Sequence, residues 1–287
     1  MQIPNIEFDH SLCRFSDFEV LDIEDLSCRT LDHDPQRPHK VGFFQVIYFE
    51  SGEGQHMIDF EDYGFSSGTV IFVFPEQIHA FDFSNKPKGK VLLFTHRFLD
   101  QVLHSTRLPD HSPFNLNHDR HPVVTTDKMS QARCNALIEQ IDLETTHPNA
   151  TPLIVMHLFS AILLLLHRLM PTRKNDHLSD DQRRTFNAFL KLLNTNPRQI
   201  REATWFANQV NTTYKTLNKI CKLEAGMTAK QLIDSLAVME IKRNLVIARV
   251  TIKRLAFDSG FEDVSNFIKY FKKHTGKTPS QFQKRHS

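Results

Sequence analysis

Cysteine is scarce in this sequence, and its spacing suggests no bonded pairs. The four cysteines are widely scattered, and none forms a C-x-x-C spacing; they are Cys13, Cys28, Cys134 and Cys221. This arrangement predicts free thiols in a reducing cytoplasm rather than a disulfide-bonded secreted protein. The start of the chain also lacks a basic segment followed by an apolar one, so we expect no secretory signal and a cytoplasmic location.

Long hydrophobic runs are lacking as well. The longest, residues 153–170, is short for a membrane-spanning helix of roughly 20 residues and contains His157, Ser160, His167 and Arg168. We therefore expect no membrane partner, and we interpret this run as a helix that is buried or forms a dimer.

Motifs of several common enzyme classes are missing too. The sequence has no Ser-His-Asp nucleophile elbow, no Gly-rich phosphate-binding loop and no H-E-x-x-H helix. These absences argue against the enzymes that depend on such motifs, and we expect a protein that is not an enzyme.

Charge is distributed unevenly, although the whole chain carries only +2. Residues 1–179 contain 15 Lys and Arg against 24 Asp and Glu, a net charge of −9, whereas residues 180–287 contain 20 against 9, a net charge of +11. A basic block of this size indicates a polyanionic partner. The acidic part confines the expected contact with DNA to the C-terminal block.

The acidic part contains β structure followed by helices. Short segments rich in β-branched and aromatic residues, separated by turns with Gly and Pro, predict strands at residues 43–49, 56–60, 69–74, 78–83 and 91–95. Strands at this spacing are typical of a sandwich or small barrel. Helical periodicity then predicts helices at residues 127–144 and 153–169.

A polar segment that begins with proline, residues 171–177, indicates a linker between two domains. Ser179 and Gln182 follow it as a capping box that opens the next helix. We therefore predict two domains, residues 1–175 and 176–287.

The basic block contains one pattern twice, at residues 205–217 and 252–267. Each copy indicates a short helix with a small residue inside it, Ala207 or Ala256, then a tight turn and a basic second helix. This is the pattern of a helix-turn-helix, whose second helix enters the major groove of DNA. The alternative is that these are ordinary packed helices with solvated lysines. This alternative explains less well why the pattern occurs twice in a segment with a net charge of +11.

The second helix of each copy is predicted to present polar side chains to DNA, while Leu217, Ile220, Phe267 and Phe271 point to the core. Lysine and asparagine pair with base edges, and lysine also contacts phosphates. In the first copy the predicted DNA-contacting residues are Thr213, which also caps the helix, Tyr214, Lys215, Asn218 and Lys219. In the second copy they are Ser265, Asn266, Lys269, Lys272 and Lys273.

A helix predicted at about residues 227–248 joins the two copies. At 1.5 Å per residue, about 20 residues span roughly 30 Å. This length is close to the ~34 Å between successive major grooves on one face of DNA. We therefore expect both recognition helices to insert together.

These features closely resemble the AraC/XylS family of bacterial transcription regulators. The matching residues are Trp205, Ala207, Thr213, Leu217 and Gly226 in the first copy, and Ala256, Gly260, Phe261, Ser265, Phe267, Phe271, Lys272, Gly276 and Pro279 in the second. The sequence departs from the family at Lys269, where arginine is usual, and Gln283 stands near another usual arginine. Lysine lacks the guanidinium fork, so the resemblance implies a weaker base contact at Lys269 or a shift to phosphate.

The N-terminal part resembles, more weakly, the cupin-type sensor domain common in that family. The matching segments are residues 37–39, 43–49, 52–54 and 74–81. The resemblance implies an α+β protein, with a cupin-like β-barrel followed by helices and an all-α domain with two helix-turn-helix units. It also implies a dimer that responds to a small effector inside the barrel, with residues 153–169 forming or supporting the dimer surface.

Histidines are concentrated before Asp180, where fourteen of the sixteen occur, and His39, His56, His79 and His96 fall on or near the predicted strands. Imidazole is a common metal ligand. Cupin enzymes, however, use an H-x-H cluster, which these strands lack. We therefore expect no metal and no cofactor, and a cupin metalloenzyme is the less favoured alternative.

Effector pockets are mostly apolar with a few placed polar groups. The predicted ligand-binding residues are Arg37, His39, Gln45 and His79 as polar groups, with Phe44 and Phe81 as walls. Arg37 is expected to hold a carboxylate or a sugar hydroxyl. The Phe-rich walls favour an aromatic or fatty acid over a sugar.

Together these patterns predict a sequence-specific DNA-binding transcription regulator, controlled by a small molecule in the N-terminal barrel. Its expected partners are double-stranded promoter or operator DNA, the effector, a second copy of the chain and, as a further candidate, RNA polymerase. The alternative in the same class is a regulator without an effector, whose barrel serves only to form the dimer.

Overall fold

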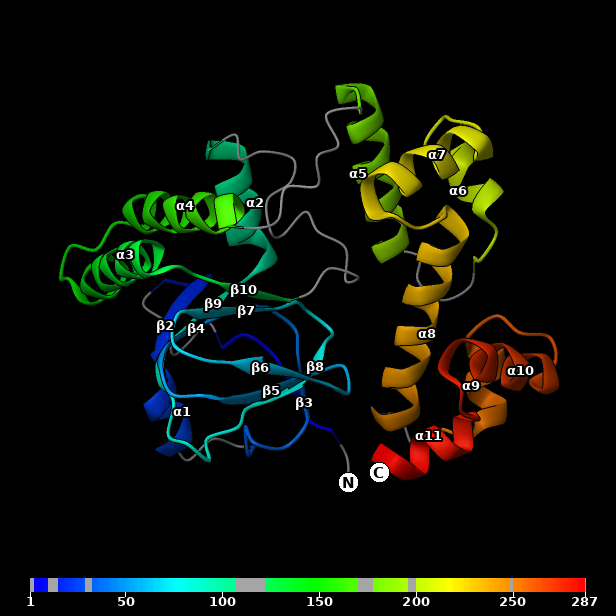
Figure 1. Ribbon diagram of the computed structural model, residues 1–287, viewed down its shortest axis with the longest axis horizontal. Helices are drawn as coiled ribbons and strands as arrows, with labels where there is room; N and C mark the ends of the chain where they lie inside the picture. The colour runs from blue at the N-terminus through cyan, green and yellow to red at the C-terminus, as the bar shows by residue number, and fades with distance from the viewer. Residues whose placement is uncertain are drawn as a thin grey trace. The chain divides into compact units, whose positions relative to one another are not determined.

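The computed structural model describes residues 3–9, 15–28, 33–106, 122–169, 178–195, 200–247 and 250–286. These residues form two compact units, an N-terminal one that ends at residue 169 and a C-terminal one that begins at residue 178 (Figure 1). The predicted linker and the predicted boundary between residues 175 and 176 lie outside the described residues, so both stay predictions.

Two five-stranded sheets form the N-terminal unit. The first has the order β1 (Asn5–Ile6), β3 (His39–Val41), β8 (Ile78–Ala80), β5 (Gly54–Ile58) and β6 (Glu61–Phe65). The second has the order β10 (Val123–Thr125), β7 (Thr69–Val73), β4 (Phe44–Ser51), β9 (Lys88–Phe94) and β2 (Phe18–Asp22). Strands β1 and β3 are parallel, and the other neighbours pair antiparallel.

The two sheets enclose a shared apolar layer. Ile47, Ile71 and Val91 of the second sheet belong to the same buried cluster as Val41 and Ile58 of the first. The α+β class and the β-rich N-terminal domain are therefore confirmed. Within the described ranges the strands of the two sheets do not pair with each other, so the expected barrel is a sandwich rather than a hydrogen-bonded closed cylinder.

Strand β4 is buried on both faces because successive side chains point to opposite sides of a sheet. Ile47 and Phe49 belong to the layer between the sheets. Phe44, Val46 and Tyr48 belong to a second cluster, which the strand shares with helices. Because both of its faces are buried, this central strand requires an almost continuous run of apolar residues.

Three helices cover the outer face of the second sheet: α2 (His96–Thr106), α3 (Lys128–Thr146) and α4 (Pro152–Leu169) (Figure 1). A short helix, α1 (Ile23–Cys28), follows β2. By length and composition alone α4 could cross a membrane. Its side chains Phe159 and Leu163 are nevertheless fully buried in the cluster that the helices share with the second sheet, as expected for a core helix.

The described residues of the C-terminal unit are helical and contain two helix-turn-helix pairs. Its helices are α5 (Asp180–Thr195), α6 (Ala203–Gln209), α7 (Tyr214–Ala225), α8 (Ala229–Ile247), α9 (Ile252–Asp258), α10 (Val264–Thr275) and α11 (Pro279–His286). Helices α6 and α7 form the first pair, α9 and α10 form the second, and α8 joins them (Figure 1). The predicted helix-turn-helix architecture is thus confirmed.

Capping residues define the ends of the recognition helices α7 and α10. At the start of α7, the Thr213 hydroxyl accepts a hydrogen bond from the Thr216 N–H at 3.1 Å, as the sequence predicts. Gly226 and Gly276 end the two helices in the left-handed region, each with a φ of 73°. Glycine adopts this conformation without the steric cost of a Cβ atom.

Gly89 in β9 tolerates a side chain poorly. Its φ is +155°, and a Cβ atom added there would lie 1.9 Å from the Tyr48 carbonyl oxygen. Gly89→Ala is expected to lower the free energy of unfolding of the N-terminal unit by about 2–4 kcal/mol, because the overlap is with backbone. Gly64→Ala is the control, since its Cβ would meet nothing within 4 Å, and it should change stability by less than about 0.5 kcal/mol.

Urea unfolding followed by circular dichroism measures both changes. Trp205, the only tryptophan, lies on α6 in the other unit, so its fluorescence transition should stay in place. Equal unfolding midpoints for the two glycine variants would contradict the prediction.

Candidate DNA interface and effector site

Helix α7 turns one face to the core of the C-terminal unit and the other to solvent. Leu217 and Ile220 are buried, as the helical spacing predicts. The exposed members of the predicted DNA-contacting set in this pair are Thr213, Tyr214, Lys215 and Lys219. The first recognition helix therefore presents a polar, basic surface.

Helix α10 has the same division. Phe267 and Phe271 are fully buried. All five predicted DNA-contacting residues of this pair are exposed, namely Ser265, Asn266, Lys269, Lys272 and Lys273. Both recognition helices thus separate packing residues from residues that are free to meet a partner.

In the part of the chain that the structure describes, the side chains of the exposed predicted lysines have no ion pair and no hydrogen bond; they are Lys215, Lys219, Lys269, Lys272 and Lys273. Arg254 on α9, by contrast, pairs with Asp258 on the same helix. Unpaired exposed cations produce a positive surface potential, which suits the phosphates of DNA.

The Asn218 side chain makes a hydrogen bond within the protein, and this bond competes with contact to a DNA base. Its side-chain oxygen accepts a hydrogen bond from the Ala229 N–H at 3.0 Å, at the start of α8. The bond satisfies a donor that has no partner within the helix. A bidentate contact with adenine would require Asn218 to give it up, so this residue differs from the other members of the set.

A buried polar cluster connects the two sheets of the N-terminal unit. It consists of His39 on β3, Gln45 on β4, His56 on β5 and His79 on β8, each at most 4% exposed, and we call it the histidine cluster. Gln45 Nε2 lies 3.2 Å from His79 Nε2, and His79 Nδ1 lies 3.3 Å from His56 Nε2. The rings of His39 and His79 are 4.2 Å apart between centroids.

With the Gln45 amide in the orientation of this structure, its nitrogen is the donor, and this orientation determines the direction of the other hydrogen bonds. The Gln45 amide nitrogen donates to His79 Nε2, so His79 carries its proton on Nδ1 and donates to His56 Nε2. His56 then carries its proton on Nδ1. At the two ends, Gln45 Oε1 and His56 Nδ1 are buried without a hydrogen-bond partner among the described residues. The cluster therefore offers one free acceptor and one free donor.

Burial keeps the histidines of this cluster neutral. It lowers the pKa of His39 to about 4 and the pKa of His56 to about 3, and it lowers the pKa of His79 well below the usual value. Neighbouring imidazoles lower the pKa of His56 and His79 further. At neutral pH the cluster is therefore suited to binding through hydrogen bonds rather than through charge.

The two predicted walls lie in different places. The Phe81 ring is 4.8 Å from the His56 ring and 5.5 Å from the His79 ring, so it lines the cluster. Phe44 stacks on Phe94 at 5.4 Å, on the helix-covered face of β4. Phe44 is placed away from the cluster because it precedes Gln45 by one residue and points to the opposite side.

Arg37 also lies apart from the histidine cluster. Its side chain is 59% exposed, and its Nε lies 3.4 Å from an Asp34 carboxylate oxygen. Its backbone carbonyl oxygen lies 3.0 Å from His39 Nδ1. His56 is the member that the predicted site omits; its two-residue spacing from the buried Ile58 is the signal that it faces inward.

A separate depression of about 640 Å³ lies between α2 and α4, and its lining residues are Arg97, Asp100, Gln101, His104, Ser105 and Met156. Most of these side chains are exposed, and none belongs to the predicted effector site. Across the described ranges, no group of three or more His, Cys, Asp or Glu side chains is arranged to hold a metal ion.

Comparison with known proteins identifies the family. The model of an AraC-like ligand binding domain matches residues 26–184, more than half of the chain, and the model of a helix-turn-helix domain matches residues 206–285. This chain belongs to the AraC family. It is a DNA-binding transcription regulator with an N-terminal ligand-binding domain.

The individual proteins that this chain resembles are distant from it in sequence. The HTH-type transcriptional activator RhaS of Escherichia coli (strain SMS-3-5 / SECEC) is 23% identical over 253 residues, which cover 84% of this chain and 85% of RhaS. ToxT from Vibrio cholerae is 15% identical with a TM-score of 0.45, over 93% of this chain and 98% of ToxT. A ToxT structure with bound (E)-4-(8-methylnaphthalen-1-yl)but-3-enoic acid is 15% identical with a TM-score of 0.46, over 94% and 100% of the two chains.

Lys215 on α7 and Asn266 on α10 allow a test of base contact in this AraC-family chain. Lys215→Ala and Asn266→Ala are each expected to weaken binding to a specific site about tenfold or more, because a lost base contact costs roughly 1–3 kcal/mol. Binding to random DNA should fall less. Lys191→Ala, which removes an exposed charge on α5, is the control. Fluorescence anisotropy with both duplexes measures the losses, and equal losses on both would assign the two side chains to phosphates.

The lowered pKa values of His39 and His56 predict acid-sensitive stability. Between about pH 6.5 and about pH 4 the unfolded chain binds protons at these histidines that the folded chain does not. Acidification therefore destabilises the N-terminal unit, by up to about 1.4 kcal/mol per pH unit for each histidine. In His56→Gln the difference in bound protons between the unfolded and folded chain falls by about one, so the slope of stability against pH should become less steep.

Urea unfolding of the wild type and the variant at several pH values measures the slope of stability against pH. His157→Gln removes an imidazole from the exposed face of α4 and serves as the control. An identical slope in the wild type and His56→Gln would contradict a neutral, buried His56.

Proposed function

We propose that this AraC-family regulator reads operator DNA with α7 and α10 and responds to a small organic acid or alcohol bound at the histidine cluster. The observation that carries the effector proposal is the pair of buried unpaired atoms, Gln45 Oε1 and His56 Nδ1. A buried polar atom without a partner costs about 1–3 kcal/mol. A ligand hydroxyl or protonated carboxyl that donates a hydrogen bond to Gln45 Oε1, or accepts one from His56 Nδ1, removes that cost at the atom it reaches.

Aromatic side chains beside the cluster support an apolar ligand body. Phe81 stacks on Phe83 at 5.4 Å and lies edge-on to His56. Aromatic surfaces suit an aromatic or aliphatic chain better than a sugar. The cluster is closed to solvent, so entry of the effector requires local opening of the sheets. An aromatic or fatty acid therefore remains the favoured effector class.

The DNA-contacting residues are divided by position. Lys215 and Asn266 are proposed to contact bases, near the starts of their helices. The remaining lysines of the predicted set, Lys219, Lys269, Lys272 and Lys273, are proposed to contact phosphates. Thr213, Tyr214 and Ser265 flank them at the helix starts, and Asn218 is proposed to act through its cap on α8.

A homodimer formed through α3 and α4 is part of this proposal. These helices expose large apolar side chains, each between 42% and 65% exposed: Met129, Leu143, Leu153, Ile154 and Leu164. Contact with a second copy would remove this apolar surface from water. A cytoplasmic location, contact with RNA polymerase near promoters and the lack of an enzymatic activity are further predictions that fit a regulator.

Native mass spectrometry of the full-length protein as purified tests the effector site. We expect a dimer with an organic adduct, whose mass gives the effector class. Gln45→Leu removes the free acceptor and the bond to His79 at similar size, and it should lose the adduct. His96→Leu is the matched control, because the His96 ring contacts Phe44, which points away from the cluster, and it should keep the adduct.

Three results would contradict the proposal. An adduct retained by Gln45→Leu would place the effector elsewhere. A metal adduct would favour the cupin metalloenzyme. A wild-type protein without adduct, whose affinity for DNA does not respond to added aromatic or fatty acids, would favour the regulator without an effector.

A further inference from the structure

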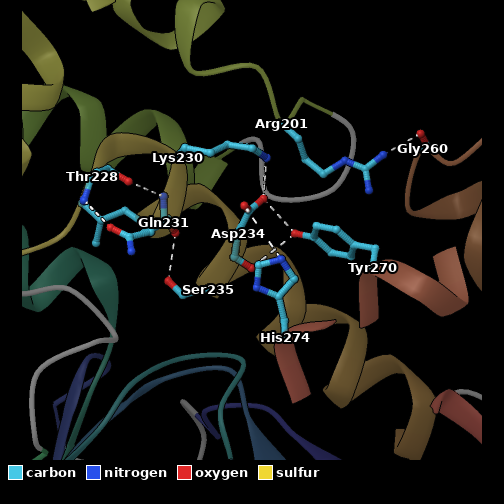
Figure 2. Close-up of polar contacts among 10 residues, drawn as sticks. Arg201, Thr228, Lys230, Gln231, Asp234, Ser235, Gly260, Tyr270 and His274 are labelled. Carbon is cyan, nitrogen blue, oxygen red and sulfur yellow. Dashed lines mark hydrogen bonds and ion pairs between the residues drawn. The ribbon is translucent and has the colours of Figure 1, made fainter. Parts of the chain in front are cut away.

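Arg201 connects the two helix-turn-helix units independently of the α8 backbone. It lies just before α6, and its Nη2 donates a hydrogen bond to the Gly260 carbonyl oxygen at 2.9 Å, in the turn between α9 and α10 (Figure 2). Its guanidinium carbon lies 3.5 Å from the centroid of the Phe261 ring and 5.4 Å from that of Tyr270. One side chain of the first unit thus contacts three residues of the second.

Asp234 on α8 meets the second unit at the same place. Its carboxylate accepts a hydrogen bond from Tyr270 Oη at 2.9 Å and pairs with Lys230 Nζ at 2.5 Å, and His274 Nε2 lies 3.9 Å away (Figure 2). Asp234 is only 8% exposed. Through Tyr270, helix α10 is therefore tied to α8 and placed beside Arg201. We call the group Arg201, Asp234, Gly260, Phe261 and Tyr270 the Arg201 cluster.

The contacts of Arg201 depend closely on geometry. Burial lowers the pKa of its guanidinium, and its Nη1 is buried without a hydrogen-bond partner in the described residues. A desolvated cation gains more from an aromatic ring than an exposed one does, and a hydrogen bond weakens steeply as its angle departs from linear. A rotation of the second unit would therefore weaken both contacts of Arg201 at once.

Each helix-turn-helix unit also has apolar packing of its own. Phe206 and Leu217 are fully buried in the first, and Leu255, Phe267 and Phe271 are buried in the second. The Arg201 cluster therefore adds to these cores a second connection beside α8. With two connections, the second unit is restrained from turning about α8.

We propose that Arg201 is a positioning residue that fixes the distance and rotation between α7 and α10, and thereby selects the number of base pairs between the two sequences that they read. This inference rests on the proposed reading of DNA by both helices. One added base pair moves the second sequence by about 3.4 Å and turns it by about 35°. A rigid pair of helices tolerates few such changes.

Selection of binding sites from a random duplex library tests this inference with the full-length protein. The wild type is expected to enrich two motifs at one spacing, and Lys215→Ala and Asn266→Ala identify the motif that each helix reads. Arg201→Ala should enrich the same motifs at two or more spacings. On a fixed site, one inserted base pair should weaken the wild type about tenfold or more and Arg201→Ala less than about threefold.

Two further variants distinguish an effect on the relative position of α7 and α10 from an effect on the stability of the C-terminal unit. Arg254→Ala is the matched control, because its guanidinium pairs with Asp258 within α9 and joins no units; it should keep the single spacing. Tyr270→Phe keeps the ring beside Arg201 but removes the hydrogen bond to Asp234. It should tolerate the inserted base pair better than the wild type and less well than Arg201→Ala.

One unchanged spacing in Arg201→Ala, with Trp205 fluorescence that reports a folded C-terminal unit, would overturn the inference. If Arg201→Ala does not fold, an unchanged spacing in Tyr270→Phe would overturn it as well. Failure of the wild type to enrich any motif would instead refute the proposed reading of DNA, so the two failures are distinguishable.

Discussion

The N-terminal unit depends on the burial of both faces of β4. Because neighbouring side chains point to opposite sides, this one strand supplies Phe44 and Tyr48 to the helix layer and Gln45 and Ile47 to the space between the sheets. A shift of its pairing by one residue would exchange the two sets. The strand would then bring Gln45 against apolar helices and Phe44 against the histidines. Correct register is therefore needed both for the core and for the histidine cluster.

In the C-terminal unit, α7 and α10 each have a buried face that packs in the core and an exposed face with the residues predicted to contact DNA. Phe267 and Phe271 fill the core beneath α10, and the side chains of Lys269 and Lys272 lie on its exposed face without an ion-pair partner among the described residues. Exposed like charges repel one another, and a bound polyanion removes that repulsion. Arg254 lies on the preceding helix, outside the predicted DNA-contacting set, and its charge is paired with Asp258.

The sequence predicts best what is decided within a few residues. The helix-turn-helix pairs and their caps follow from local spacing, as the bond from Thr216 to Thr213 illustrates. The direction in which each face of a strand points is not decided locally. Alternation puts Phe44 and Gln45 on opposite faces, but the sequence pattern does not say which of them faces the other sheet. Long-range contacts are less accessible still. Arg201 and Gly260 are 59 residues apart, and each has an ordinary local context.

The hydrogen bonds of the histidine cluster can reverse without the movement of any strand. If the Gln45 amide turns over, its oxygen accepts a hydrogen bond from His79 Nε2–H, and His79 Nδ1 then accepts one from His56 Nε2–H. His56 Nδ1 changes from donor to acceptor at the far end. A ligand that donates and a ligand that accepts at His56 would thus favour opposite orientations of one amide on β4. If the proposed effector binds at this cluster, its two-state proton arrangement distinguishes ligands by polarity rather than by size.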